Sequence, residues 1–115
     1  MIVSVDFDGT ITEASSPDKP GFNVLRPACA QVMWKLHHMG VKFYLLTGRR
    51  EEWIPEAVQL CKKWGLPIDT SHPNTKVISD FYIDDKNIGC VGIDWLRIYD
   101  MLHCAAMLER EEAVD

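Results

Sequence analysis

The chain has 115 residues, which suits one domain spanning residues 1–115 and leaves no room for a second folded unit. Hydrophobic residues make up 47% and charged residues 25%, a balance that excludes a disordered chain. The net charge of −5 disfavours a nucleic-acid partner, because such a chain repels phosphate backbones unless a local basic patch overrides the balance. The candidates for such a patch are Arg49, Arg50, Lys62 and Lys63.

No apolar stretch is long enough to span a bilayer, and a strand pattern begins at once with no signal peptide ahead of it. The cysteines show no C-x-x-C spacing, so we expect buried thiols in a reducing cytosol rather than a zinc site. They are Cys29, Cys61, Cys90 and Cys104. These features predict a cytoplasmic protein without a membrane partner.

Strands are expected over residues 2–7, 41–46 and 81–85, because each is a mostly apolar run of the kind found in a sheet covered on both faces. A short strand is expected near 67–69 and another over 88–93. Residues 11–23 are rich in Ser, Pro, Asp and Gly and predict a loop or small flap.

Helices are expected between these strands. The first has Pro27 in its first turn and ends at Gly40, and the second runs from 54 to 64 before Gly65. Asp94 is expected to cap a last helix. Its predicted apolar side consists of Leu96, Tyr99, Leu102 and Ala106. This alternation predicts an α/β fold, a Rossmann-like three-layer α/β/α sandwich with a mostly parallel sheet.

Polar clusters follow three of the expected strands: Asp6-x-Asp8-Gly9-Thr10, then Thr47-Gly48-Arg49-Arg50, then Asp84-Asp85-Lys86-Asn87. Ligands of open α/β sheets bind outside the carboxyl ends of the strands, so all three clusters should meet at one edge. Two carboxylates about 4 Å apart repel by about 4 kcal/mol at an effective dielectric near 20. Four acids therefore require protonation or a cation, and oxygen ligands favour Mg²⁺.

The remaining residues at this edge indicate a phosphate. Thr47 supplies a hydroxyl, while Gly9 and Gly48 allow close approach of the backbone. The helix that starts near Glu51 presents its positive end to an anion, and Lys76 could reach in from the loop before the acidic strand. Together with a metal, these groups could hold a phosphoryl group during transfer.

The two acids of the first cluster suit different roles. Asp6 is ionised at neutral pH without an activating base, so it can attack phosphorus and form an aspartyl-phosphate. Asp8 lies two residues on and can protonate the leaving oxygen, then activate water for the second step. Arg49 and Arg50 are either surface charges or substrate contacts, and Trp53 lies one turn from the phosphate-binding end of its helix.

Four segments resemble, in order, the motifs of the haloacid dehalogenase (HAD) superfamily of phosphohydrolases. "DFDGT" is similar to the nucleophile loop, "LLTGR" to the second motif with Thr47 in the phosphate-binding place, and "YIDDKN" to the acidic fourth motif. Lys76 stands where the third motif puts its lysine, with Lys86 as the alternative. The motifs frame residues 2 to about 90.

The resemblance implies that Asp6 is the nucleophile and Asp8 the general acid/base. It implies Mg²⁺ at the Asp6 carboxylate, the Asp8 backbone carbonyl and a fourth-motif acid, with Asp85 expected to bind directly and Asp84 through water. It also implies a Rossmann-like core with a helical squiggle and flap after the first strand. Residues 11–46 and 48–75 are too short to house the cap domain of most members, so a capless member is expected.

The expected function is therefore a Mg²⁺-dependent phosphatase acting on a phosphate monoester, either a small molecule or a macromolecule. Alternatives are a nucleic-acid 3′-phosphatase or a phosphoprotein phosphatase of the same mechanism. A non-hydrolytic phosphoacceptor or binding module is a further class. Without a cap, cover for the site must come from the flap, from a neighbouring subunit in a homo-oligomer, or from a bulky substrate.

Overall fold

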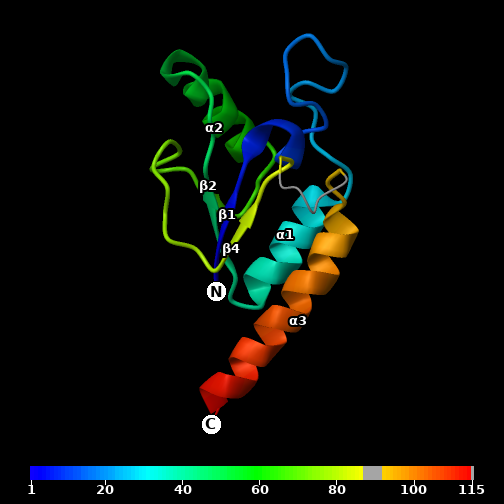
Figure 1. The fold of residues 1–115 in the computed structure, drawn as a ribbon, viewed down its shortest axis with the longest axis vertical. Coiled ribbons are helices and arrows are strands. Elements are labelled where there is room, and N and C mark those ends of the chain that lie inside the picture. Colours follow the sequence, from blue (N-terminus) through cyan, green and yellow to red (C-terminus); the bar gives the residue numbers. More distant parts are fainter. Residues whose placement is uncertain (87–91, 115) are drawn as a thin grey trace.

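The structure is a computed structural model that describes residues 1–86 and 92–114. Its sheet has four parallel strands in the order β3-β2-β1-β4 (Figure 1). Their bounds are β1 (Ile2–Val5), β2 (Lys42–Leu45), β3 (Ile68–Asp69) and β4 (Phe81–Ile83). The predicted fold class is confirmed: the protein is a small α/β domain whose all-parallel sheet is flanked by helices, in keeping with a Rossmann-like three-layer sandwich.

The strand register fixes where the site lies. Val5 of β1 pairs with Leu45 of β2 and with Ile83 of β4, so these three strands end at the same level. The polar clusters that follow them therefore leave the sheet at one edge, as expected for parallel strands.

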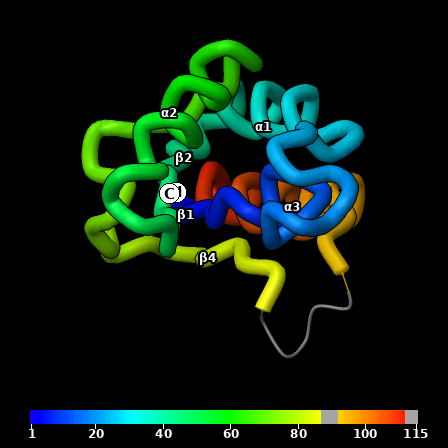
Figure 2. The backbone as a smooth tube through the Cα atoms, turned by 90° about the horizontal axis from the view of Figure 1, so that it is seen from above, coloured from blue at the N-terminus to red at the C-terminus, as the bar shows by residue number. Residues whose placement is uncertain are grey.

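Three α-helices share the core with the sheet: α1 (Cys29–His38), α2 (Ile54–Lys63) and α3 (Trp95–Val114). A short helix, η2 (Glu51–Trp53), precedes α2. The helices α1 and α3 lie side by side in both views (Figures 1 and 2). Alternate strand residues such as Val3 and Val5 are fully buried and join the buried residues of all three helices in one hydrophobic cluster.

The side chain between these two core residues, Ser4, is buried by a different segment. Its hydroxyl shares a 2.6 Å hydrogen bond with that of Ser79, in the segment that leads into β4. The segment around Ser79 therefore covers the face of the sheet on which the Ser4 side chain lies.

A single irregular helical turn, η1 (Phe7–Ile11), follows β1 directly. The chain then forms a hairpin flap, in which Thr12 pairs with Leu25 and Glu13 N–H donates to Val24 O at 2.9 Å. The turn and flap agree with the expected arrangement. The described segments that link β1 to β2 and β2 to β3 contain no cap domain, only the turn, the flap and helices.

Several boundaries differ from the predictions. The helix α1 begins at Cys29, so Pro27 lies outside it, and Cys104 is exposed rather than buried. Asp94 caps α3 by accepting Leu96 N–H at 3.0 Å, as predicted. Leu96 itself is 63% exposed, whereas Trp95 is buried and its indole N–H donates to Thr10 O at 3.0 Å.

The strand expected over 88–93 falls mainly on residues 87–91, outside the described part of the chain. Within the described residues, no helix has both the length and the apolar character that crossing a membrane requires.

Candidate active site

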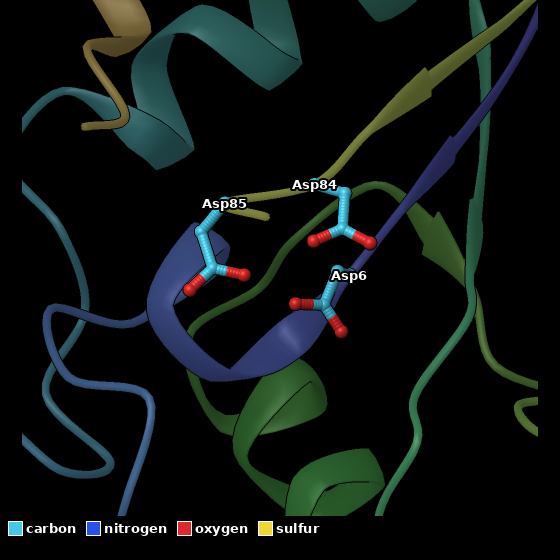
Figure 3. Close-up of side chains that lie close together, drawn as sticks. All are labelled: Asp6, Asp84 and Asp85. Carbon is cyan, nitrogen blue, oxygen red and sulfur yellow. The ribbon is translucent and has the colours of Figure 1, made fainter. Parts of the chain in front are cut away.

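Three carboxylates meet at the carboxyl edge of the sheet (Figure 3). Asp6 follows β1 and continues its pairing with β4, because Asp6 N–H donates to Ile83 O at 3.0 Å. Asp84 and Asp85 follow β4 directly. One carboxylate oxygen from each of Asp6, Asp84 and Asp85 lies within 4.8 Å of the other two. We call these three residues the acid cluster.

The acid cluster is electrostatically strained. Burial, together with repulsion from Asp84 and Asp85, raises the pKa of Asp6 to about 7. Burial and the adjacent Asp84 also raise the pKa of Asp85. Asp85 Oδ1 is buried and accepts no hydrogen bond from the described residues. A buried, unpaired carboxylate oxygen among other acids fits a hard divalent cation such as Mg²⁺.

Thr10 connects the two halves of the acid cluster. Its hydroxyl donates to Asp6 Oδ2 at 3.4 Å and accepts Asp85 N–H at 3.1 Å. Thr10 is fully buried, so this link lies beneath the carboxylates. Thr10 was not among the predicted site residues, although its place in the D-x-D-G-T segment was the available signal.

Gly9 makes room for the acid cluster. Its φ of +78° lies in the left-handed region, and a Cβ at this position would overlap Asp85 Oδ2. The structure therefore gives Gly9 a role in seating Asp85, while its predicted contact with phosphate stays a prediction.

Asp8 lies outside the acid cluster because it has a cation of its own. Arg49 Nε donates to Asp8 Oδ2 at 2.9 Å and Arg49 Nη2 donates to Asp8 Oδ1 at 2.8 Å, a bidentate pair. Asp8 was expected to share one small volume with the other three acids; it lines the same cleft as Asp6 and adds to the rise in the Asp6 pKa, but its carboxylate pairs with Arg49 instead of joining the acid cluster. A metal contact through the Asp8 carbonyl stays a prediction.

Arg49 is a buried junction rather than a surface charge, because its side chain is only 4% exposed. Besides Asp8, it donates to Asn23 Oδ1 in the flap at 2.6 Å and to Glu56 Oε1 in α2 at 3.1 Å. The guanidinium also lies over the Phe7 and Phe22 rings, 4.9 and 5.1 Å from their centroids. The hydrogen bond to Asp8, more than any other contact, raises the pKa of Arg49.

A cleft of about 270 Å³ opens above these groups. It brings together predicted site residues from the three strand ends with flap residues that form one wall. Arg50 and Trp53 stand on its rim, with side chains that are 80% and 50% exposed. The lining residues are Asp6, Asp8, Ser15, Pro17, Phe22, Gly48, Arg49, Arg50, Trp53 and Lys86.

Five predicted site residues do not line this cleft: Gly9, Thr47, Lys76, Asp84 and Asp85. Thr47 is 5% exposed, and its hydroxyl accepts Arg49 N–H at 3.2 Å. The Lys76 ammonium lies 5.0 Å from the centre of the Tyr82 ring. Lys86, the alternative for the third-motif role, does line the cleft. The geometry therefore favours Lys86 over Lys76, and the catalytic roles of Thr47 and both lysines stay predictions.

No protein-family model matches the sequence, and the comparison with curated proteins gives no match. The solved structure of a conserved protein from Bacteroides thetaiotaomicron is similar to this one. The two chains are 29% identical with a TM-score of 0.69, over 90% of this chain and 89% of the other. This similarity supports the α/β fold and assigns no activity.

The seating of Asp85 predicts different outcomes for two glycines of the site. Gly9→Ala should lower the free energy of unfolding by about 2 kcal/mol or more, because of the positive φ and the overlap with Asp85. Gly48→Ala should change it by less than about 0.5 kcal/mol, since no atom of the described residues other than its chain neighbours lies within 4 Å of its Cβ position. Urea unfolding measures both, and equal losses would contradict the role of Gly9.

The strained acids predict how stability depends on pH. The pKa of Asp6 rises from 3.8 to about 7 on folding, so the unfolded chain loses this proton first and the Asp6 contribution falls as pH rises from about 4 to 7. Asp6→Asn, which does not titrate, should therefore be more stable than the parent at pH 8 and gain little at pH 4. Thermal melts in chelator test this, with the exposed Asp100→Asn as control. A gain as large at pH 4 as at pH 8 would refute the assignment.

Proposed function

We propose that this chain is a Mg²⁺-dependent phosphatase of the haloacid dehalogenase type without a cap, acting on a phosphate monoester through an aspartyl-phosphate on Asp6. The proposal rests mainly on one observation: the acid cluster, whose Asp6 lines the cleft, contains a buried Asp85 oxygen with no partner among the described residues. The resemblance of the four sequence motifs agrees with it.

The residues of the acid cluster suit a magnesium ion. The Asp6 and Asp85 carboxylates and the Asp8 backbone carbonyl would hold it, with Asp84 contributing through water. The bound ion would supply charge neutralisation for the phosphoryl oxygens. Neutralisation of the cluster also favours the ionised form of Asp6, which then attacks phosphorus and displaces the leaving oxygen.

Asp8 would give a proton to the leaving oxygen and later take one from water. In the structure both of its oxygens accept a hydrogen bond from Arg49, so proton transfer must use a lone pair that Arg49 leaves free, or one of these bonds must open. Asn23 and Phe22 of the flap hold the same guanidinium. Movement of the flap would therefore change how Asp8 is held.

The bidentate contact of Asp8 with Arg49 also favours a second candidate function. If Arg49 holds the Asp8 carboxylate where it cannot reach the attacking water, the second step lacks its general base and the aspartyl-phosphate persists. The chain would then act as a phosphoacceptor module rather than a phosphatase.

The cleft is open and its rim residues contact solvent, which fits a small or a macromolecular phosphate ester.

The test of the leading proposal is turnover of p-nitrophenyl phosphate. Activity should require Mg²⁺, disappear in excess chelator, and disappear in Asp6→Asn because an amide is a poor nucleophile. Asp100→Asn, an exposed acid on α3, should keep parental activity. Release of one nitrophenolate per chain without further turnover would favour the phosphoacceptor, and activity of Asp6→Asn equal to that of the parent would refute both.

The ion pair predicts a non-additive pair of variants. Asp8→Asn should lower kcat about 10²- to 10⁴-fold by removing proton transfer. Arg49→Lys keeps the charge but loses the bidentate geometry, so kcat should fall about tenfold. In the Asp8→Asn background the same lysine should change kcat very little. A full tenfold further loss in that background would show that Arg49 acts independently of Asp8.

A further inference from the structure

The helix α3 carries a second regularly spaced row of residues, on the side that faces away from the core. Trp95, Leu102 and Ala106 form its buried side. On the opposite side lies a row of exposed residues at alternating spacings of four and three, the seam pattern of a coiled coil. We call this row the α3 seam; it consists of Arg97, Met101, Cys104, Leu108 and Glu111.

The middle of the α3 seam is apolar and strongly exposed. The Met101 and Leu108 side chains are 70% and 60% exposed, and Cys104 lies between them. Leu96 and Met107, which are 63% and 41% exposed, enlarge the apolar area on one flank. The C-terminal end of α3 extends beyond the end of α1 (Figure 1), which leaves this part of the helix accessible.

The charges at the two ends of the α3 seam indicate which partner could pack against it. Arg97 and Glu111 lie seven residues on either side of Cys104 and have opposite signs. If two copies pack with antiparallel α3 helices about a twofold axis at Cys104, each Arg97 faces the Glu111 of the other copy. Met101 then lies beside the other Leu108. A parallel arrangement would instead place like charges opposite each other.

We propose that the α3 seam is an interface between two copies of this chain, packed antiparallel about Cys104. The self-complementary charge pattern is the observation that selects a second copy over another partner. From Arg97 to Glu111 the contact is about 21 Å long, at about 1.5 Å per residue. None of the seam residues lines the cleft, so both clefts stay open and the proposal is independent of the proposed function.

Sedimentation equilibrium tests whether the dimer forms. The molar mass should rise from 13.1 kDa towards twice that value as the protein concentration increases to about 1 mM, the range of a weak interface. Leu108→Lys should keep the chain monomeric over this range. The control is Ile78→Lys, which places the same charge at a 92% exposed position away from α3 and should leave the dimer unchanged.

Charge reversal tests the antiparallel geometry. Arg97→Glu should weaken the dimer about tenfold or more at low salt, because it converts two attractive contacts into two repulsive ones. The double variant Arg97→Glu/Glu111→Arg should restore the parental dissociation constant. Arg110→Glu, an exposed change off the seam, serves as the charge control.

Each result of these experiments either supports or overturns the proposed interface. Restoration by the double variant supports the antiparallel α3 interface. A strict monomer at every concentration overturns it, and so does a dimer that is insensitive to Leu108→Lys or not restored by the double charge reversal.

Discussion

The bidentate contact between Asp8 and Arg49 lies at the point where three parts of the chain meet. Through this one guanidinium, the turn after β1 is connected to the flap at Asn23 and to α2 at Glu56. A buried ion pair of this kind leaves an uncompensated charge if either partner is lost. The arrangement of the flap over the cleft and the orientation of Asp8 therefore depend on the same contact.

The same contact decides how charge is divided at the sheet edge. Because Arg49 neutralises Asp8, the acid cluster contains three carboxylates rather than four. No comparable side-chain cation pairs with Asp6 or Asp85 in the described residues, and burial together with repulsion raises the pKa of both. The molecule thus keeps one acid in a paired state beside neighbours whose pKa values are raised, and perturbed pKa values of this kind are common at functional sites.

The sequence was sufficient for the acid cluster, because parallel strands that end together bring Asp6, Asp84 and Asp85 to one edge. It was not sufficient for Arg49, whose partner depends on how the flap folds back and on which rotamer the long side chain adopts. The choice between Trp95 and Leu96 as the buried residue of α3 required knowing that the indole reaches Thr10 O. Similarly, Lys76 and Lys86 differ only in where their loops run, which no local pattern specifies.

The strand β4 is short, partly exposed and paired with a strand that is distant in the sequence. It is three residues long, pairs with β1 from about 80 positions away, and carries Phe81 and Tyr82 side chains that are 44% and 40% exposed. Such a strand belongs to the part of a fold that opens locally before the rest unfolds. Its departure from β1 would also carry Asp84 and Asp85 away from Asp6 and relieve their repulsion. Local opening of β4 and neutralisation of the acids are therefore linked equilibria. A cation bound at the acid cluster would stabilise the state in which β4 is paired with β1.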